Sequence, residues 1–362
     1  MSKRKIAVIG GGIFGLEIAT SLNAFSHRVT LFEKENSVLT KTTSNNQNRL
    51  HLGLHYPRDL ETARQSRIGY ENFIKKYPSC VKIDFENYYG ISKKESLTTT
   101  DAFVAFAKLA DIPIIQIESE TINSLGFNSN LIDSLWKCNE AVIDISKYRG
   151  LALERAAAVG LSIECSTEIS DAFFDGSRWR LFSGDEDHGN FDVVIRATYG
   201  QDEISINVSP ETSRVYEYQQ TLVHEVSSSA KSFGLTIIDG DFVTILPSGF
   251  SSNFLLYSPL PSVLNRYVGN SIPLNWNFSD KKMIDMSYEV VSKRAQNYAP
   301  ILGTFSRRRT LKAIRSLQPF VSQTDKRISY FSTDYPNFYD IHSGKVDHAI
   351  AIADSLVQIF SV

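Results

Sequence analysis

Hydrophobic and polar residues follow a strand–helix–strand pattern at the start of the chain. Residues 5–9 are a short apolar run that stops at glycines, as a buried parallel strand does. Residues 13–25 carry apolar side chains at helical spacing, and residues 28–33 form a second strand-like run. The pattern therefore predicts a βαβ unit.

The rest of the chain alternates between helical and strand-like segments. Apolar positions at helical spacing predict helices over 60–77, 101–110, 146–159 and 345–360. Residues 213–258 instead contain alternating, aromatic-rich segments separated by turn signals such as Asp239-Gly240, which predicts antiparallel sheet. The run Arg307–Arg309 is expected to flank a helix that begins near Thr310. This interleaving predicts an α/β fold with two domains, each built from discontinuous segments.

Composition narrows the class of protein. A chain of 362 residues, 42% of them hydrophobic, can bury a substantial core, and its length favours two domains. The formal net charge of -2 provides no basic field for nucleic acid, and no apolar run reaches the roughly 18 residues of a membrane span. Cys80, Cys138 and Cys165 are widely spaced, so we expect reduced thiols of a cytoplasmic protein and no metal site.

A glycine motif lies between the first strand and the helix. Gly10, Gly12 and Gly15 match the pattern G-x-G-x-x-G. The first glycine permits a tight turn, the second lets a pyrophosphate approach the backbone at the helix N-terminus, and the third lets helix and strand pack closely. Glu33 ends the second strand, where a carboxylate accepts hydrogen bonds from an adenosine ribose. We therefore expect a Rossmann-like dinucleotide site formed by Gly10, Gly12, Ile13, Phe14, Gly15, Glu33 and Lys34.

The segment after Glu33 favours FAD over a nicotinamide cofactor. A carboxylate at this place disfavours the phosphorylated ribose of NADP. A nicotinamide-binding domain would continue with further strand–helix repeats, whereas residues 42–49 are polar and rich in asparagine. Such a loop suits the extended body of FAD. An NAD-binding protein without enzymatic activity stays an alternative.

Residues 43–58, Thr-Ser-Asn-Asn-Gln-Asn-Arg-Leu-His-Leu-Gly-Leu-His-Tyr-Pro-Arg, resemble a stretch of the D-amino-acid oxidase/glycine oxidase superfamily of flavoproteins. The motif is most similar to that of the branch that contains L-2-hydroxyglutarate oxidases, whose members carry a similar Ser/Asn-rich stretch before His-x-Gly-x-x-Tyr. The resemblance implies that the FAD is lined by Ser44, Asn45, Asn48, Leu50 and His51. It also implies that His51, Gly53 and Tyr56 lie near the isoalloxazine ring.

Later stretches are similar to the same family. Residues 192–200 resemble the strand and turn that close over the cofactor, and residues 166–169 resemble the strand that meets the adenine. Residues 337–345 resemble the family's C-terminal strand–Ser-Gly-Lys–helix, whose N-terminus points at the flavin. The further FAD contacts implied are Ile169, Ala197, Thr198, Gly200, Ser343, Gly344 and Lys345. The resemblance implies an FAD-binding domain of residues 1–80, 141–204 and 316–362, with a substrate domain of residues 81–140 and 205–315.

Candidate catalytic residues are His51, His55 and Lys345. A histidine near the flavin can take a proton from a substrate hydroxyl or ammonium; alternatively it holds the cofactor or braces the loop. Lys345 would stabilise negative charge on the reduced flavin unless it is an exposed lysine of the first helical turn. Gly344 would let the backbone approach the ring.

Tyr56, Arg58 and Tyr218 are candidate substrate contacts. Arg58, like Arg49, could hold a carboxylate through two parallel hydrogen bonds, although an arginine in a polar loop also serves structure. The family's Arg-Pro…Asp-Gly-x-Pro signature is absent; Arg315-Ser-Leu-Gln-Pro-Phe stands in its place.

The combined hypothesis is an FAD-dependent oxidase or dehydrogenase. It would transfer hydride to flavin N5 from a carbon that bears an amine or hydroxyl, in an amino acid, an amine or a 2-hydroxy acid. Oxygen or another acceptor would take the electrons. The alternative within flavoproteins uses FAD without net redox turnover, as in mutase or RNA-modification chemistry.

Overall fold

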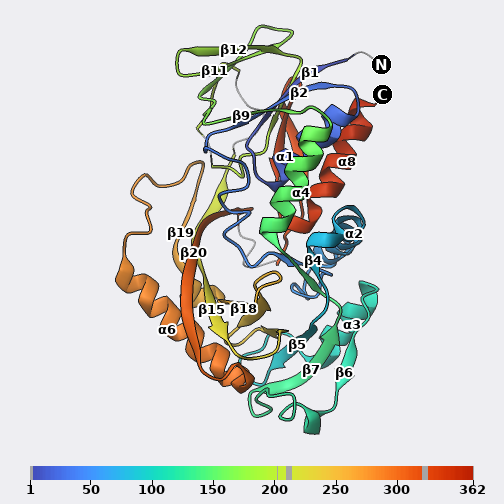
Figure 1. The fold of residues 1–362 in the computed structure, drawn as a ribbon, viewed down its shortest axis with the longest axis vertical. Helices are drawn as coiled ribbons and strands as arrows, with labels where there is room; N and C mark the ends of the chain where they lie inside the picture. The colour runs from blue at the N-terminus through green and yellow to red at the C-terminus, as the bar shows by residue number, and fades with distance from the viewer. Residues whose placement is uncertain (1–2, 202, 209–213, 320–324, 362) are drawn as a thin grey trace.

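The computed structural model describes residues 3–201, 203–208, 214–319 and 325–361 (Figure 1). The expected domain ends at residues 1 and 362, and residue 213 at the start of the expected antiparallel region, lie outside the described residues. Four sheets organise the described part of the chain, and helices cover two of them.

A six-stranded sheet has the order β21-β22-β13-β1-β2-β9. Its centre is β1 (Lys5–Ile9), which pairs in parallel with β2 (Arg28–Glu33) and with β13 (Val193–Arg196). The outer strands are β9 (Ser162–Cys165), β21 (Tyr330–Tyr335) and β22 (Phe338–His342), and only the β21–β22 pair is antiparallel. The predicted βαβ unit is thus confirmed, with α1 (Ile13–Ala24) as its helix.

The two faces of this sheet are covered differently. Ile6 and Val8 pack in one core with α1, α4 (Ile145–Ala158) and α8 (Ala349–Phe360), which lie together on one side of the sheet (Figure 1). Ala7 and Ile9 point the other way, as alternation along a strand requires, and pack with a four-stranded sheet. That sheet contains β10 (Asp171–Phe174), β11 (Trp179–Ser183), β12 (Glu186–Phe191) and β14 (Ser205–Ile206).

The nine-stranded sheet joins segments that are far apart in the sequence. β5 (Glu86–Ser92) pairs in parallel with β16 (Phe233–Ile238), and their neighbours are antiparallel. The other strands are β6 (Ile115–Ile117), β7 (Ile132–Cys138), β15 (Tyr216–Ser228), β17 (Thr244–Pro247), β18 (Asn253–Tyr257), β19 (Val263–Gly269) and β20 (Phe305–Leu317). One core of this sheet includes α6 (Lys281–Tyr298), and another includes α3 (Thr100–Leu109). The predicted α/β class with a mixed second sheet is confirmed.

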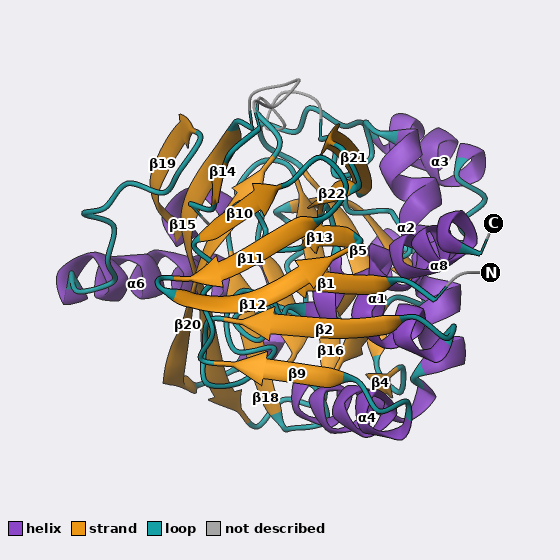
Figure 2. Ribbon diagram, turned by 90° about the horizontal axis from the view of Figure 1, so that it is seen from above, coloured by secondary structure: helices purple, strands orange, loops and turns teal. Residues whose placement is uncertain are grey.

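A small sheet carries the loop that resembles the flavoprotein stretch. It has the order β3-β8-β4, formed by β3 (Arg49–Leu50), β8 (Ala141–Ile143) and β4 (Val81–Lys82). The chain leaves β3 toward α2 (Leu60–Lys76), whose first turn is capped because the Asp59 carboxylate accepts a hydrogen bond from Thr62 N at 2.7 Å. Figure 2 shows α2, α1 and α8 on the same side of the molecule. Short helices lie at Pro78–Cys80, Ser119–Thr121, Pro259–Ser262, Pro300–Leu302 and Val346–His348.

The helix expected near Thr310 is wrong, because residues 305–317 form the strand β20. Leu311 and Ala313 are buried while Lys312 is exposed, which is the period of two that a strand requires. Pairing of β20 with β15 overrides the local signal. The C-terminal helix also differs slightly from the prediction: Lys345 precedes a 3-10 turn at Val346–His348, and α8 follows.

The packing of α1 on β1 generates a prediction about two glycines. A Cβ on Gly15 would lie 1.8 Å from the carbonyl oxygen of Gly10, whereas a Cβ on Gly150, inside α4, would meet nothing within 4 Å. We expect Gly15→Ala to lower the free energy of unfolding by about 3 kcal/mol through overpacking. Gly150→Ala should raise it by about 0.5–1 kcal/mol. Urea unfolding measures both changes, and equal effects of the two variants would contradict this packing.

Candidate active site

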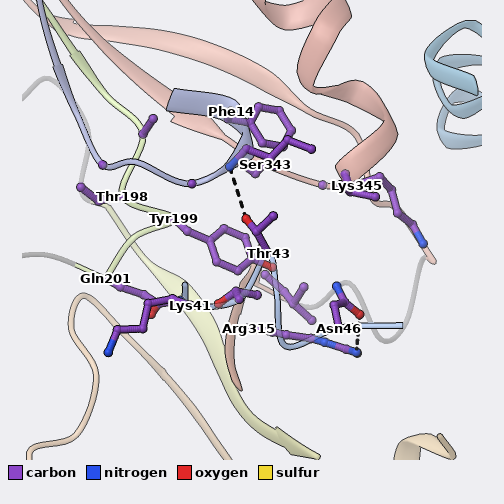
Figure 3. A pocket seen from close by; sticks show the side chains of 18 of the residues that line it. Phe14, Lys41, Thr43, Asn46, Thr198, Tyr199, Gln201, Arg315, Ser343 and Lys345 are labelled. Atoms are coloured by element: carbon purple, nitrogen blue, oxygen red, sulfur yellow. Dashed lines mark hydrogen bonds between the residues drawn. The ribbon is translucent and has the colours of Figure 1, made fainter. Parts of the chain in front are cut away.

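One cavity of about 860 Å³ extends along the carboxyl ends of β1, β2 and β13, the edge at which open α/β sheets bind ligands. One end is lined by Glu33, Lys34 and Thr167–Ser170, and the middle by Gly10, Gly12 and Thr43. The other end is lined by residues of the loop after β3, the nine-stranded sheet and the segment before α8. Figure 3 shows Phe14, Thr43, Arg315 and Lys345 around this space.

The glycine turn forms a cradle for an anion. Gly10 has φ +103° and a Cβ there would lie 2.7 Å from Ala197 O, so only glycine fits. A Cβ on Gly12 would meet only Thr43 Oγ1, at 3.6 Å, and would occupy the cavity space in front of α1. Ile13 N donates to that same hydroxyl at 3.2 Å (dashed in Figure 3). The helix N-terminus with its N–H groups therefore faces an open space suited to a phosphate.

Glu33 organises the end of the cavity nearest β2. Its carboxylate accepts hydrogen bonds from Gly11 N at 2.6 Å and from Glu35 N at 2.8 Å. A carboxylate has about four acceptor positions, so this one can still accept from two ribose hydroxyls. Lys34 Nζ lies 3.6 Å from Glu168 Oε1. Ile169 lines the same end of the cavity, where its apolar side chain suits contact with an adenine ring.

At the opposite end, Lys345 reaches into the cavity instead of facing solvent. Its Nζ lies 3.0 Å from Nε2 of His51. An ammonium only donates, so His51 accepts at Nε2 and carries its proton on Nδ1. That Nδ1 is 3.9 Å from the Glu140 carboxylate, which places both ring nitrogens toward protein groups.

Glu140 is the centre of a buried polar network. Its Oε2 accepts from Arg49 Nη1 at 3.0 Å and from Tyr89 OH at 2.7 Å. Its Oε1 accepts from the backbone N–H of Leu52 at 2.9 Å. Arg49 also donates to Thr236 Oγ1 on β16. The network fixes the loop that carries His51 and leaves neither charge without a partner.

Burial and neighbouring cations keep the histidines neutral. Burial lowers the pKa of His51 well below its usual value, and the charges of Lys345, His55 and Arg49 lower it further. The pKa of His55 is also well below its usual value, through burial and then Lys345 and Arg49. Burial lowers the pKa of Lys345, partly opposed by Tyr56 and Asp347.

Most of the predicted site residues line the cavity together. These are Gly10, Gly12, Ile13, Phe14, Glu33, Lys34, Asn48, His51, His55, Tyr56, Arg58, Ile169, Ala197, Thr198, Ser343, Gly344 and Lys345. Arg58, however, is paired with Asp239 at 3.0 Å and with Asp325 at 2.6 Å. The reason for glycine at 344 is also not the one expected: a Cβ would lie 1.9 Å from the carbonyl oxygen of Arg327.

Other predicted residues do not line the cavity. Ser44 and Asn45 turn back to the loop, where they donate to the carbonyls of Leu39 and Thr40. Tyr218 is fully buried, and its hydroxyl donates to Gly200 O at 2.7 Å. Leu50 belongs to the core under α1, Gly15 packs against Gly10, and Gly200 forms the turn after Thr198 with φ +67°.

Arg315 is a lining residue to which the sequence assigned no role. It lies near the end of β20, and its guanidinium donates to Tyr257 OH at 3.1 Å and to Asn46 Oδ1 at 3.3 Å (Figure 3). Tyr199 and Tyr257 line the same part of the cavity. The strand period of β20 is the signal that would have placed Arg315 on one face with Ala313 and Leu317.

A model of the FAD-dependent oxidoreductase family matches residues 5–339. The chain belongs to this family. Its cofactor is FAD, and the residues described above fit this group: an open cradle at Gly12 for the pyrophosphate, free acceptor positions on Glu33, and a long cavity from there to Lys345. The flavoprotein superfamily inferred from residues 43–58 is confirmed, while the narrower branch stays a prediction.

Known proteins of this kind resemble the chain over different lengths. It is 27% identical over 261 residues to the FAD-dependent monooxygenase FPY4 of Fusarium mangiferae, a match that spans 71% of this chain and 64% of that protein. The L-α-glycerophosphate oxidase of Mycoplasma pneumoniae has the same fold, with a TM-score of 0.78 and 16% identity. The match covers 100% of this chain and 96% of the oxidase chain. The L-proline dehydrogenase of P. horikoshii matches with a TM-score of 0.75 and 13% identity. That match covers 99% of this chain and 94% of the dehydrogenase chain. Within the described residues, none of the helices has the length and apolar character to cross a membrane.

The cradle leads to a prediction about FAD binding. A Cβ at position 12 would make only an ordinary van der Waals contact, 3.6 Å from Thr43 Oγ1, so Gly12→Val should leave the FAD-free protein about as stable as the wild type. It should weaken FAD binding by about 100-fold, the equivalent of an overpacking cost of about 3 kcal/mol against the pyrophosphate. Flavin absorbance after dialysis and thermal unfolding of the FAD-free protein measure the two effects. Full retention of FAD would exclude this turn as the pyrophosphate site.

Proposed function

We propose that the protein is an FAD-dependent oxidase or dehydrogenase for a small substrate that carries a carboxylate beside a carbon bearing an amine or hydroxyl. The observation that carries this proposal is the guanidinium of Arg315. It lies in the cavity wall with its side chain partly buried, and within the described residues its side-chain hydrogen bonds go to a phenol and an amide. Neither partner carries a negative charge, so this arginine is suited to a carboxylate ligand.

Two of the other arginines in the cavity wall, Arg49 and Arg58, support this choice. Arg49 is neutralised by Glu140, and Arg58 is neutralised by Asp239 and Asp325. Neither can therefore hold a substrate carboxylate without breaking an ion pair, which makes the clamp expected at Arg58 the weaker proposal. Tyr257, already in contact with Arg315, supplies a hydroxyl next to the same anion.

The cavity residues can divide the work of the reaction. When bound, FAD supplies the hydride acceptor. Arg315 and Tyr257 orient the substrate through its carboxylate, and Lys345 places positive charge at the end of the cavity where negative charge develops on reduction. His51 holds Lys345 in place through the hydrogen bond at Nε2, and Glu140 holds the loop that carries His51. Both are positioning residues in this proposal.

Anaerobic reduction of the flavin tests the function. We expect amino acids or 2-hydroxy acids to bleach the bound flavin stoichiometrically, whereas the matched amines and alcohols without a carboxylate should not. Oxygen uptake and hydrogen peroxide are then measured. The name of the FPY4 relative, a monooxygenase, makes incorporation of labelled oxygen into product the second measurement. Failure of every carboxylate in such matched pairs, with reduction by an amine or alcohol, would contradict the proposal.

A variant of Arg315 tests the carboxylate site separately. We expect Arg315→Met to weaken binding of a carboxylate substrate by about 10- to 100-fold, the scale of a lost hydrogen-bonded charge pair. Arg309→Met is the matched control, because Arg309 lies on the same strand but pairs with Glu225 outside the cavity. Titration of the flavin spectrum with a carboxylate ligand measures both. Equal affinity in the two variants would place the carboxylate elsewhere.

A further inference from the structure

Tyr56 lies in the cavity wall close to two cations. Lys345 Nζ is 4.1 Å from the centroid of the Tyr56 ring, and the same ammonium lies 3.0 Å from His51 Nε2. The guanidinium carbon of Arg327 lies 5.1 Å from the same centroid. Both cations lie within the range of cation–π contact, and both stabilise negative charge on the phenol oxygen.

This environment changes the acidity of Tyr56 in the direction opposite to burial. Burial alone raises a phenol pKa, but Lys345, Arg327 and Arg315 more than offset it, so the pKa of Tyr56 is lowered. Tyr199 lines the same cavity and shows the contrast: burial raises its pKa although Arg315 and Arg327 act on it as well. The difference is the direct contact with Lys345.

The two histidines near Tyr56 do not compete with it for the substrate's proton. The rings of His55 and Tyr56 are 4.7 Å apart, and the pKa of His55 is lowered well below its usual value, mainly by burial. His51 uses Nε2 for Lys345 and directs Nδ1 toward Glu140. Neither imidazole therefore combines an available nitrogen with enough basicity to take a substrate proton at neutral pH.

We propose that Tyr56 is a catalytic residue that accepts the substrate's proton. The inference rests on the proposed function. The C–H bond breaks with its electron pair leaving as hydride to the flavin, and the adjacent O–H or N–H bond breaks with its proton moving to the Tyr56 phenolate oxygen. A carbon–oxygen or carbon–nitrogen double bond forms in the product, and the phenol is neutral. Before the step, Lys345 and Arg327 stabilise the phenolate; after it, the proton leaves to solvent.

Ionisation of Tyr56 can be measured without any substrate. The chain contains 16 tyrosines, so the FAD-loaded protein is labelled with ¹³C at tyrosine Cζ, whose NMR shift reports phenolate formation. Tyr56→Phe identifies the Tyr56 signal, and Tyr199→Phe, at another tyrosine of the cavity, is the matched control. We expect the Tyr56 signal to titrate below the ordinary tyrosine value of about 10, and to move upward in Lys345→Met. A Tyr56 signal that titrates at or above the ordinary value would overturn the proposal.

Reduction kinetics test the role in catalysis. With a substrate that bleaches the flavin, we expect Tyr56→Phe to slow reduction by about 100-fold or more while the substrate affinity changes little. In the wild type the reduction rate should rise with pH until Tyr56 is ionised, and this rise should be absent in Tyr56→Phe. A variant that loses affinity but keeps the pH dependence would make Tyr56 a binding residue only. If no substrate reduces the flavin, the proposed function fails while the titration still decides the ionisation of Tyr56.

Discussion

The buried carboxylate of Glu140 is the interaction on which the geometry of the cavity depends. It accepts hydrogen bonds from the β3 side through Arg49 and Leu52, and from the nine-stranded sheet through Tyr89. Removing one partner of such a pair leaves an uncompensated charge, which costs about 3–5 kcal/mol. The network therefore joins the small β3-β8-β4 sheet to the nine-stranded sheet. The loop from His51 to Arg58 starts from that network and forms the wall of the cavity.

The cavity has an asymmetric distribution of charge that matches its two tasks. Near β1 and β2 the groups are backbone N–H donors and the Glu33 carboxylate, which suit a pyrophosphate and a ribose. At the other end Lys345, Arg315 and Arg327 line the cavity together with Tyr56, Tyr199 and Tyr257. Cations inside a protein cavity act more strongly on acid–base groups and on bound anions than cations in bulk water do. Arg315, the residue proposed to hold a carboxylate, also lowers the pKa of the nearby His55, as Lys345 does.

Sequence reasoning succeeded where the requirement is local. The turn at Gly10 and Gly12 could be predicted because a positive φ and an open cradle each demand glycine within a few residues. Sequence reasoning failed where pairing with a distant strand decides the local structure. A helix was predicted to begin near Thr310, yet pairing with β15 makes residues 305–317 a strand and sets the direction of Arg315. Arg315 meets Asn46 across 269 positions of the sequence, a contact that no local pattern indicates. Ser44 and Asn45 are polar, as expected for an FAD-binding loop, but their side chains donate hydrogen bonds to carbonyl groups of their own loop.

The place of β22 within the six-stranded sheet has a consequence for biosynthesis. β1 pairs with β13, and β13 pairs with β22 (Phe338–His342), so these pairings are complete only when β22 is present. The wall formed by Ser343–Lys345 follows directly after that strand. Until β22 has been synthesised, the chain therefore leaves one edge of β13 unpaired and its flavin site without the wall at Ser343–Lys345. Contacts between residues so far apart in the sequence slow folding, so we expect the cofactor site to be among the last parts of the protein to form.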